Sequence, residues 1–271
     1  MQNWIFNKYT DVLGLLLPVW SVFLLLFLLP DSFIHADFPL WMWVALVLGI
    51  DVSHVWSTIF RTYLDKEERE KHRFLLGATP ILAFSILFIL AFLSPFWFWR
   101  VLAYLALFHF IKQQYGFMML YKVKGKDFAP RKWMTDKQVI YFSMLYPVFF
   151  WHLSPDRAFS WFVSGDFFPF YDWMPIQNEI WIIGNILYLS VLFTWLFIEV
   201  RRRHKSWGKI LWVTTTAANW FLGIVYFNSD IAFTITNVVA HGIPYVILII
   251  QYEHKKSIIR AQKRNIFLIA T

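Results

Sequence analysis

Eight long apolar segments, separated by polar stretches, account for most of the chain. They occupy residues 12–30, 39–60, 74–95, 97–121, 138–152, 180–200, 209–227 and 231–252. A helix needs roughly 20 apolar residues to cross the hydrocarbon layer of a membrane. Pro147 interrupts the fifth segment, which is also the shortest, so a re-entrant path would fit there best. The pattern predicts an all-α, polytopic membrane helix bundle of about eight transmembrane helices.

The basic residues predict the orientation of this bundle. Four basic groups, within residues 61–73, 122–137, 201–209 and 255–264, each lie at the end of an even-numbered segment. Positively charged loops remain on the cytoplasmic side, so we expect these groups and both termini in the cytoplasm, with the chain crossing the cell inner membrane several times. The net charge of +8 then reflects topology and contact with anionic lipid. We expect the lipid bilayer, and no nucleic acid, among its partners.

The composition agrees with a membrane location and limits the chemistry. Hydrophobic residues make up 59% of the chain and charged residues 15%, whereas charged residues are about a quarter of an ordinary soluble domain. The chain has no cysteine, which excludes disulfides, thiolate ligands and iron–sulfur clusters. Any metal must therefore be held by nitrogen and oxygen. No repeat or low-complexity linker divides the sequence, so residues 1–271 are expected to form one integral membrane domain.

Three histidines fall near the middle of three different apolar segments, namely His54, His109 and His241. An ionisable group in hydrocarbon is costly, so it normally faces the bundle interior and has a function. Each has polar neighbours at helical spacing: Asp51 precedes His54 by three residues, and Gln113 follows His109 by four. Asn237, His241 and Tyr245 continue the same spacing, with Lys112 and Asn219 at similar depth. Each set projects from one helix face, which predicts a shared polar centre.

Non-catalytic explanations exist for each of these residues. A single histidine in a membrane helix more often forms packing hydrogen bonds than binds a metal. Asp51 has a competing role as the counter-ion of Lys112, which would satisfy both charges without a metal. Gln113, Gln114 and Asn219 either join helices by hydrogen bonds or orient ligating imidazoles.

Three imidazoles and a carboxylate favour non-haem iron, although zinc and copper also accept imidazole. Dioxygen and lipids concentrate in the bilayer, so we expect an oxygenase acting on a lipophilic substrate such as an isoprenoid, a carotenoid or an acyl chain. In this hypothesis His54, His109 and His241 bind iron, and Asp51 is a fourth ligand or orients His54. Gln113, Asn219 and Asn237 would support the ligands. Tyr245 or Lys112 would transfer protons or bind a polar end of the substrate.

Three segments carry a resemblance to a known family: GIDVSHVWSTIFRTYLD (49–65), LFHFIKQQYGFMMLY (107–121) and NVVAHGIPYVILIIQYEH (237–254). They resemble the membrane-embedded carotenoid-cleaving dioxygenases of the Brp/Blh family. The resemblance implies a mononuclear iron held by His54, His109 and His241. The family's last segment has two histidines four residues apart, and here Asn237 or Tyr245 stands at the partner position.

Two other functions use the same residues. A transporter or proton-coupled carrier would employ Asp51, Lys112 and the histidines as a relay, but the sequence shows no inverted repeat and no paired broken helices. A chromophore protein would use Lys112 as a Schiff-base amine. The sequence favours the oxygenase over both.

The predicted topology has a direct test. Reporter fusions placed after Lys126, after Lys205 and at the C-terminus should all report a cytoplasmic location, because basic loops are retained there. A fusion within residues 154–179 should report the opposite side. A cytoplasmic signal from that loop would mean that residues 138–152 do not cross.

Overall fold

The computed structural model describes residues 3–128, 134–154, 161–173, 176 and 178–270, and every regular element in these ranges is a helix. The first half of the chain contains η1 (Thr10–Leu16), α1 (Leu17–Leu28), α2 (Asp31–Ile34), α3 (Leu40–Met42), η2 (Trp43–Val52), α4 (Ser53–Arg61), α5 (Lys66–Lys71), α6 (Arg73–Leu93) and α7 (Pro95–Gly125). The second half contains α8 (Asp136–Leu153), η3 (Phe170–Asp172), α9 (Asn178–Arg201), α10 (Trp207–Trp220), η4 (Phe221–Tyr226) and α11 (Asp230–Ala270).

The all-helical architecture is confirmed, and each predicted apolar segment lies on a helix. Among the described residues, five helical runs are long and apolar enough to cross a membrane: Thr10–Leu28, Leu40–Arg61, Arg73–Leu93, Glu179–Arg201 and Asp230–Ile259. The other predicted segments correspond to α7, α8 and the α10–η4 run. Pro147 does not break α8, which runs through it without interruption.

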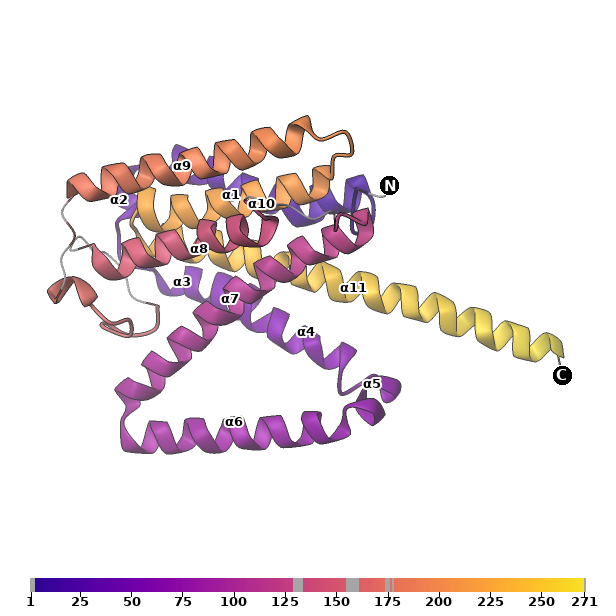
Figure 1. Ribbon diagram of the computed structural model, residues 1–271. Helices are drawn as coiled ribbons and strands as arrows, with labels where there is room; N and C mark the ends of the chain where they lie inside the picture. Colours follow the sequence, from indigo (N-terminus) through magenta and orange to yellow (C-terminus); the bar gives the residue numbers. More distant parts are fainter. Residues whose placement is uncertain (1–2, 129–133, 155–160, 174–175, 177, 271) are drawn as a thin grey trace.

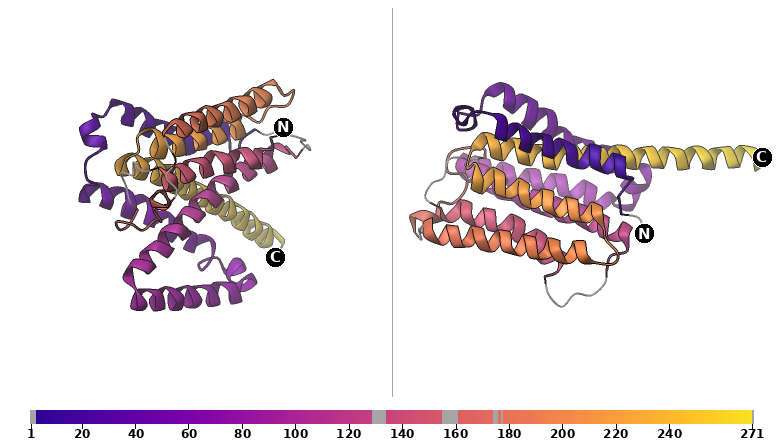
Figure 2. Two further views of the ribbon diagram at one scale, coloured as in Figure 1. Left: turned by 60° about the vertical axis from the view of Figure 1, so that its left-hand side comes forward. Right: turned by 90° about the horizontal axis from the view of Figure 1, so that it is seen from above.

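The helices run alternately in opposite directions, with α1, α8, α9, α10 and α11 side by side (Figures 1 and 2). The N-terminus, α5, the α9–α10 connection and the C-terminus all lie at one end of the bundle (Figure 1). The end of α7 and the start of α8 lie there as well, so the described parts of the four basic groups gather at that end. Helix α11 continues beyond the bundle there, well past the predicted end of the last segment at residue 252.

Helix α6 stands apart from the rest of the bundle (Figures 1 and 2). None of its 21 residues is buried, although they form the most apolar of the membrane-length helices. Helices α4 and α7 lean away from the bundle toward the two ends of α6 (Figure 1). An apolar helix with no buried side chain is suited to lipid on all sides.

A network of buried ion pairs joins the helices at the basic end. Lys209, which is completely buried, has its Nζ 2.5 Å from Asp127, 3.1 Å from Asp136 and 2.7 Å from Glu199. Lys122 pairs with Asp136 at 2.6 Å, and Arg202 pairs with Asp127 at 2.8 Å. The network connects α7, α8, α9 and α10. Buried charges are tolerated when they are paired in this way.

The same network fixes the charge of Asp127. Burial raises the pKa of this carboxyl, but hydrogen bonds from Arg202 and Lys209 outweigh burial and hold the pKa below its usual range. Asp127 is therefore ionised at neutral pH. Its contribution to stability is present above the pKa of the unfolded chain and is lost as the pH falls through the lower pKa of the folded chain.

Candidate metal centre

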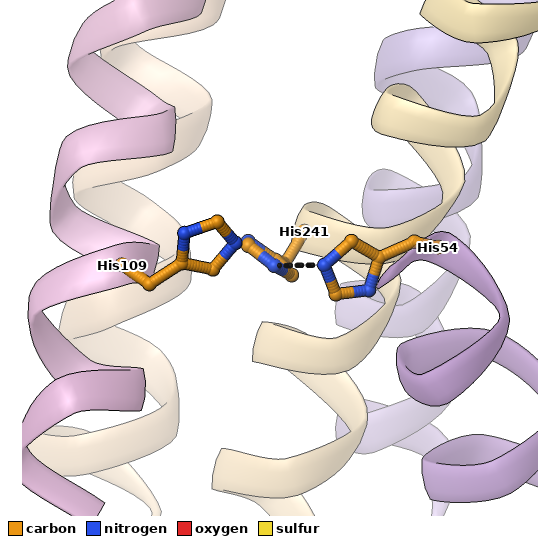
Figure 3. A group of neighbouring side chains, drawn as sticks. All are labelled: His54, His109 and His241. Carbon is orange, nitrogen blue, oxygen red and sulfur yellow. Dashed lines mark hydrogen bonds between the residues drawn. The ribbon is translucent and has the colours of Figure 1, made fainter. Parts of the chain in front are cut away.

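Three histidine side chains from three helices converge on one point (Figure 3). His54 extends from α4, His109 from α7 and His241 from α11, and each offers a ring nitrogen within 4.8 Å of the other two. The Nε2 atoms of His54 and His241 are 2.8 Å apart. Two nitrogen ligands at right angles on a metal, with bonds of about 2.1 Å, would be about 3 Å apart. The 2.8 Å separation is that of a hydrogen bond between the two rings (Figure 3), and it is also close to the separation that two ligands of one metal would have.

His241 lies on α11 about one turn before a proline, Pro244. Pro244 has no N–H, so the carbonyl of Ala240 four residues earlier lacks its usual donor within the helix. The side chain of Gln114 donates to this carbonyl at 3.2 Å, and that of Gln113 donates to the carbonyl of His241 at 2.6 Å. Both glutamines belong to α7, which also carries His109. The two helices are thus joined by hydrogen bonds at the level of the histidines.

His54 reaches the cluster because a glycine lets its segment approach α11 closely. A Cβ atom on Gly242 would lie 2.6 Å from Ile50 Cγ2 and 3.1 Å from the Ile50 carbonyl oxygen. Ile50 belongs to η2, a π-helical run that leads directly into α4. Such π-helical stretches are frequent at functional sites. The bare backbone of Gly242 therefore allows His54 to meet His241.

The nitrogen of His54 that faces away from the cluster meets a carboxylate. Its Nδ1 lies 3.3 Å from Asp51 Oδ1, a close contact without hydrogen-bond geometry, and both atoms are buried without a hydrogen-bond partner among the described residues. A carboxylate beside the second nitrogen of an imidazole fixes the tautomer and leaves Nε2 free for a metal. Of the two predicted roles for Asp51 at a metal, orientation of His54 is the one that this contact fits.

Burial around the three rings is uneven. His54 is 3% exposed and His241 1% exposed, and the ring of Phe110 stacks on His241 with centroids 3.9 Å apart. His109 is exposed on the protein surface. The Nδ1 atom of His241 is buried without a hydrogen-bond partner among the described residues. The cluster is therefore closed on two sides and open at His109.

The other predicted residues lie at different distances from this centre. The Tyr245 ring is 5.6 Å from that of His54, and its hydroxyl is 3.4 Å from Thr58 Oγ1. Asn219 donates to Asn237 at 3.3 Å, and Asn237 donates to the Phe233 carbonyl on its own helix. Both asparagines are thus occupied with each other and with the backbone. Of these residues, Tyr245 rather than Asn237 lies beside a candidate metal ligand, which is His54.

Lys112 lies one turn from His109 and is exposed. Its Nζ donates to the Tyr141 hydroxyl on α8 at 3.4 Å and lies over the ring of Tyr115. The carboxylate of Asp51 is instead next to His54. The recorded contacts of Asp51 and Lys112 thus point in different directions, so the geometry gives no support to the counter-ion hypothesis.

Gln114 was expected to join helices or to orient an imidazole, and its side chain does connect α7 to α11, whereas Gly242 was not predicted. Gln114 and Gly242 fix the positions of α7 and α11 without pointing at a ligand. The sequence contained one signal for them, because a proline inside an apolar segment leaves a carbonyl that some polar side chain must satisfy.

Comparison of the chain with protein-family models, with curated proteins and with solved structures finds no match. The resemblance to carotenoid-cleaving dioxygenases therefore rests on the three sequence segments alone.

Replacement of any one of the three clustered histidines should release most of a bound metal, because each change removes one ligand. We expect His54→Ala, His109→Ala and His241→Ala to lose metal when the purified proteins are measured by elemental analysis. His72→Ala and His204→Ala should retain the wild-type content, since both lie outside the cluster. Equal occupancy in all five variants would eliminate the site.

Gly242→Ala should disturb the cluster without removing a ligand. The added methyl group would press on Ile50, and overpacking of this kind typically costs about 1–3 kcal/mol. We expect a lower unfolding temperature and reduced metal content. Gly116→Ala on α7 is the matched control, because a Cβ there meets nothing within 4 Å and alanine is the better helix former. A Gly242→Ala protein with wild-type metal content would show that the close approach is not needed.

Proposed function

We propose that this chain is a membrane-embedded non-haem iron oxygenase that acts on a lipophilic substrate. The observation that carries the proposal is the convergence of His54, His109 and His241, from three helices, with ring nitrogens within 4.8 Å of one another. Buried histidines without a ligand would be an expensive way to pack membrane helices.

The set of donors supports iron over other metals. Two or three imidazoles with a nearby carboxylate and open positions are typical of non-haem iron sites that use dioxygen, while zinc and copper remain chemically compatible. Bound iron would supply the activation of dioxygen. Asp51 would hold His54 in the tautomer that presents Nε2, and the packing of Phe110 on His241 would keep water from that side.

A lipophilic substrate would reach this centre from the side of the protein. His109 is the exposed member of the cluster, and exposed apolar side chains flank it on α7 (Leu105 and Phe108) and extend along α4 (Val55 and Trp56). Helix α6 stands off from both helices (Figure 1). An isoprenoid, a carotenoid or an acyl chain dissolved in the bilayer could approach His109 along this surface without crossing water.

Two polar side chains would assist the reaction. The Tyr245 hydroxyl, beside His54 and Thr58, would donate or accept a proton. Lys112, exposed one turn beyond His109, would meet a polar end of the substrate. The resemblance of the three histidine segments to carotenoid-cleaving dioxygenases makes a carotenoid the first substrate to test.

The same proposal includes a location. We place the chain in the cell inner membrane as a multi-pass protein with eight spans and with both termini in the cytoplasm. The collection of all four basic groups at one end of the bundle (Figure 1) supports this orientation through the positive-inside rule.

The test combines metal analysis with oxygen consumption. Detergent-purified protein should contain iron, and it should consume dioxygen when a carotenoid, a linear isoprenoid or a fatty acyl lipid is added. His109→Ala should lose both properties, while His72→Ala should keep both. Wild-type protein without iron that instead moves protons across a liposome membrane would contradict the oxygenase and favour the carrier.

A further inference from the structure

A cavity of about 410 Å³ lies at the basic end of the bundle, between the N-terminal segment and the α9–α10 connection. Figure 1 shows these two segments close to each other. Basic side chains dominate the lining: Lys126, Arg202, Arg203, His204 and Lys205. Asp127 is the single carboxylate among the described lining residues. The volume falls within the range of about 300–1,000 Å³ that is usual for small-molecule sites.

The charge of Asp127 is already compensated. Its carboxylate lies 2.8 Å from Arg202 and 2.5 Å from Lys209. No ion pair is recorded for Lys126, Arg203 or Lys205 in the part of the chain that the structure describes. The three remaining cations therefore make the cavity electropositive, and they are available to an anionic ligand.

Helix α10 begins at this cavity and adds a second attraction for anions. Ser206 is its N-cap residue, but the side chain makes no capping hydrogen bond. Its Oγ is buried without a partner among the described residues, and the residue is only 5% exposed. The first N–H groups of a helix also lack acceptors within the helix and favour negative charge. The buried hydroxyl beside this helix N-terminus thus has an open position for a hydrogen-bond partner that the described residues do not fill.

Gly208 allows the N-terminal segment to approach the start of α10 closely at the edge of the cavity. A Cβ atom there would lie 2.4 Å from the carbonyl oxygen of Asn3 and 2.3 Å from the Tyr121 ring. Without that atom, the Gly208 N–H donates to the Asn3 carbonyl at 3.2 Å. The N-terminal segment is thereby fixed against α10 and forms a wall of the cavity.

We propose that this cavity binds a phosphate-bearing anion. The phosphate oxygens would accept a hydrogen bond from Ser206 Oγ and would lie at the positive end of α10, where the Gly208 N–H is already bound to Asn3, and Arg203 and Lys205 would supply the opposing charge. A helix N-terminus with basic side chains is a well-suited arrangement for this group. The phosphate would belong either to a lipid headgroup at the membrane surface or to a free phosphate compound. This site is separate from the histidine cluster and does not depend on the proposed oxygenase function.

The experiment measures the unfolding temperature of the full chain with two probes. The first probe is inorganic phosphate added to protein in detergent, and the second is phosphatidylglycerol, compared with phosphatidylcholine, in lipid nanodiscs. A ligand that binds only the folded protein raises the unfolding temperature in a concentration-dependent manner. A response to inorganic phosphate identifies a free phosphate compound as the ligand class, and a response only to phosphatidylglycerol identifies the headgroup.

Three variants test the residues. Arg203→Ala/Lys205→Ala should weaken binding of the effective probe at least about tenfold, because it removes two charge-assisted hydrogen bonds. Lys66→Ala/Lys71→Ala is the matched control, since it removes the same charge from exposed positions on α5 at the same end of the bundle. Ser206→Ala should weaken binding while leaving the unfolding temperature without ligand unchanged or raised, because its hydroxyl has no partner to lose.

Two results would overturn the proposal. One is the absence of any shift with either probe. The other is an equal response of the Arg203→Ala/Lys205→Ala protein and of the α5 control, which would mean general attraction to a basic surface. A Ser206→Ala protein that is destabilised without ligand but binds normally would show instead that the hydroxyl caps the helix.

Discussion

The missing N–H of Pro244 is the constraint from which the centre of this structure follows. In an apolar bundle there is no water to satisfy the carbonyl of Ala240, so a side chain from another helix must do it. Gln114 provides that donor, and Gln113 binds the adjoining carbonyl of His241. These two bonds set the register of α7 against α11. The separation of His109 from His241 is therefore fixed by backbone chemistry and not by a ligand.

A different kind of contact fixes the third histidine. His54 is brought in by the backbone approach at Gly242 and is held by Asp51. In this site α7 and α11 are joined by hydrogen bonds, and the η2–α4 segment is joined to α11 by close packing. At the basic end, Lys209 joins four helices through charge alone.

The sequence predicted the helices well because an apolar segment in a bilayer is a strong signal. Every predicted segment starts within two residues of the start of a helix, where contiguous π-helical and α-helical stretches count as one helix. The three histidines were found because ionisable groups are rare at that depth. The direction of Lys112 was not predictable, since spacing defines a face on one helix but not the rotation of its neighbours. Lys209 was counted only as part of the basic group at residues 201–209, and its complete burial was not predicted, because two of its three carboxylates, Asp127 and Asp136, are distant in the sequence.

Helix α6 illustrates how a span with no buried side chain still matters to a site. Its sequence can vary among apolar residues more freely than that of a packed helix, since none of its side chains is buried in the protein. Its existence, however, decides the direction in which α7 runs. Without α6 the chain would enter α7 from the opposite end of the bundle, with His109 and the two glutamines in reversed order along it. Helix α6 therefore acts on the centre by reversing the direction of the chain, an effect that depends on its presence and length more than on the identity of its residues.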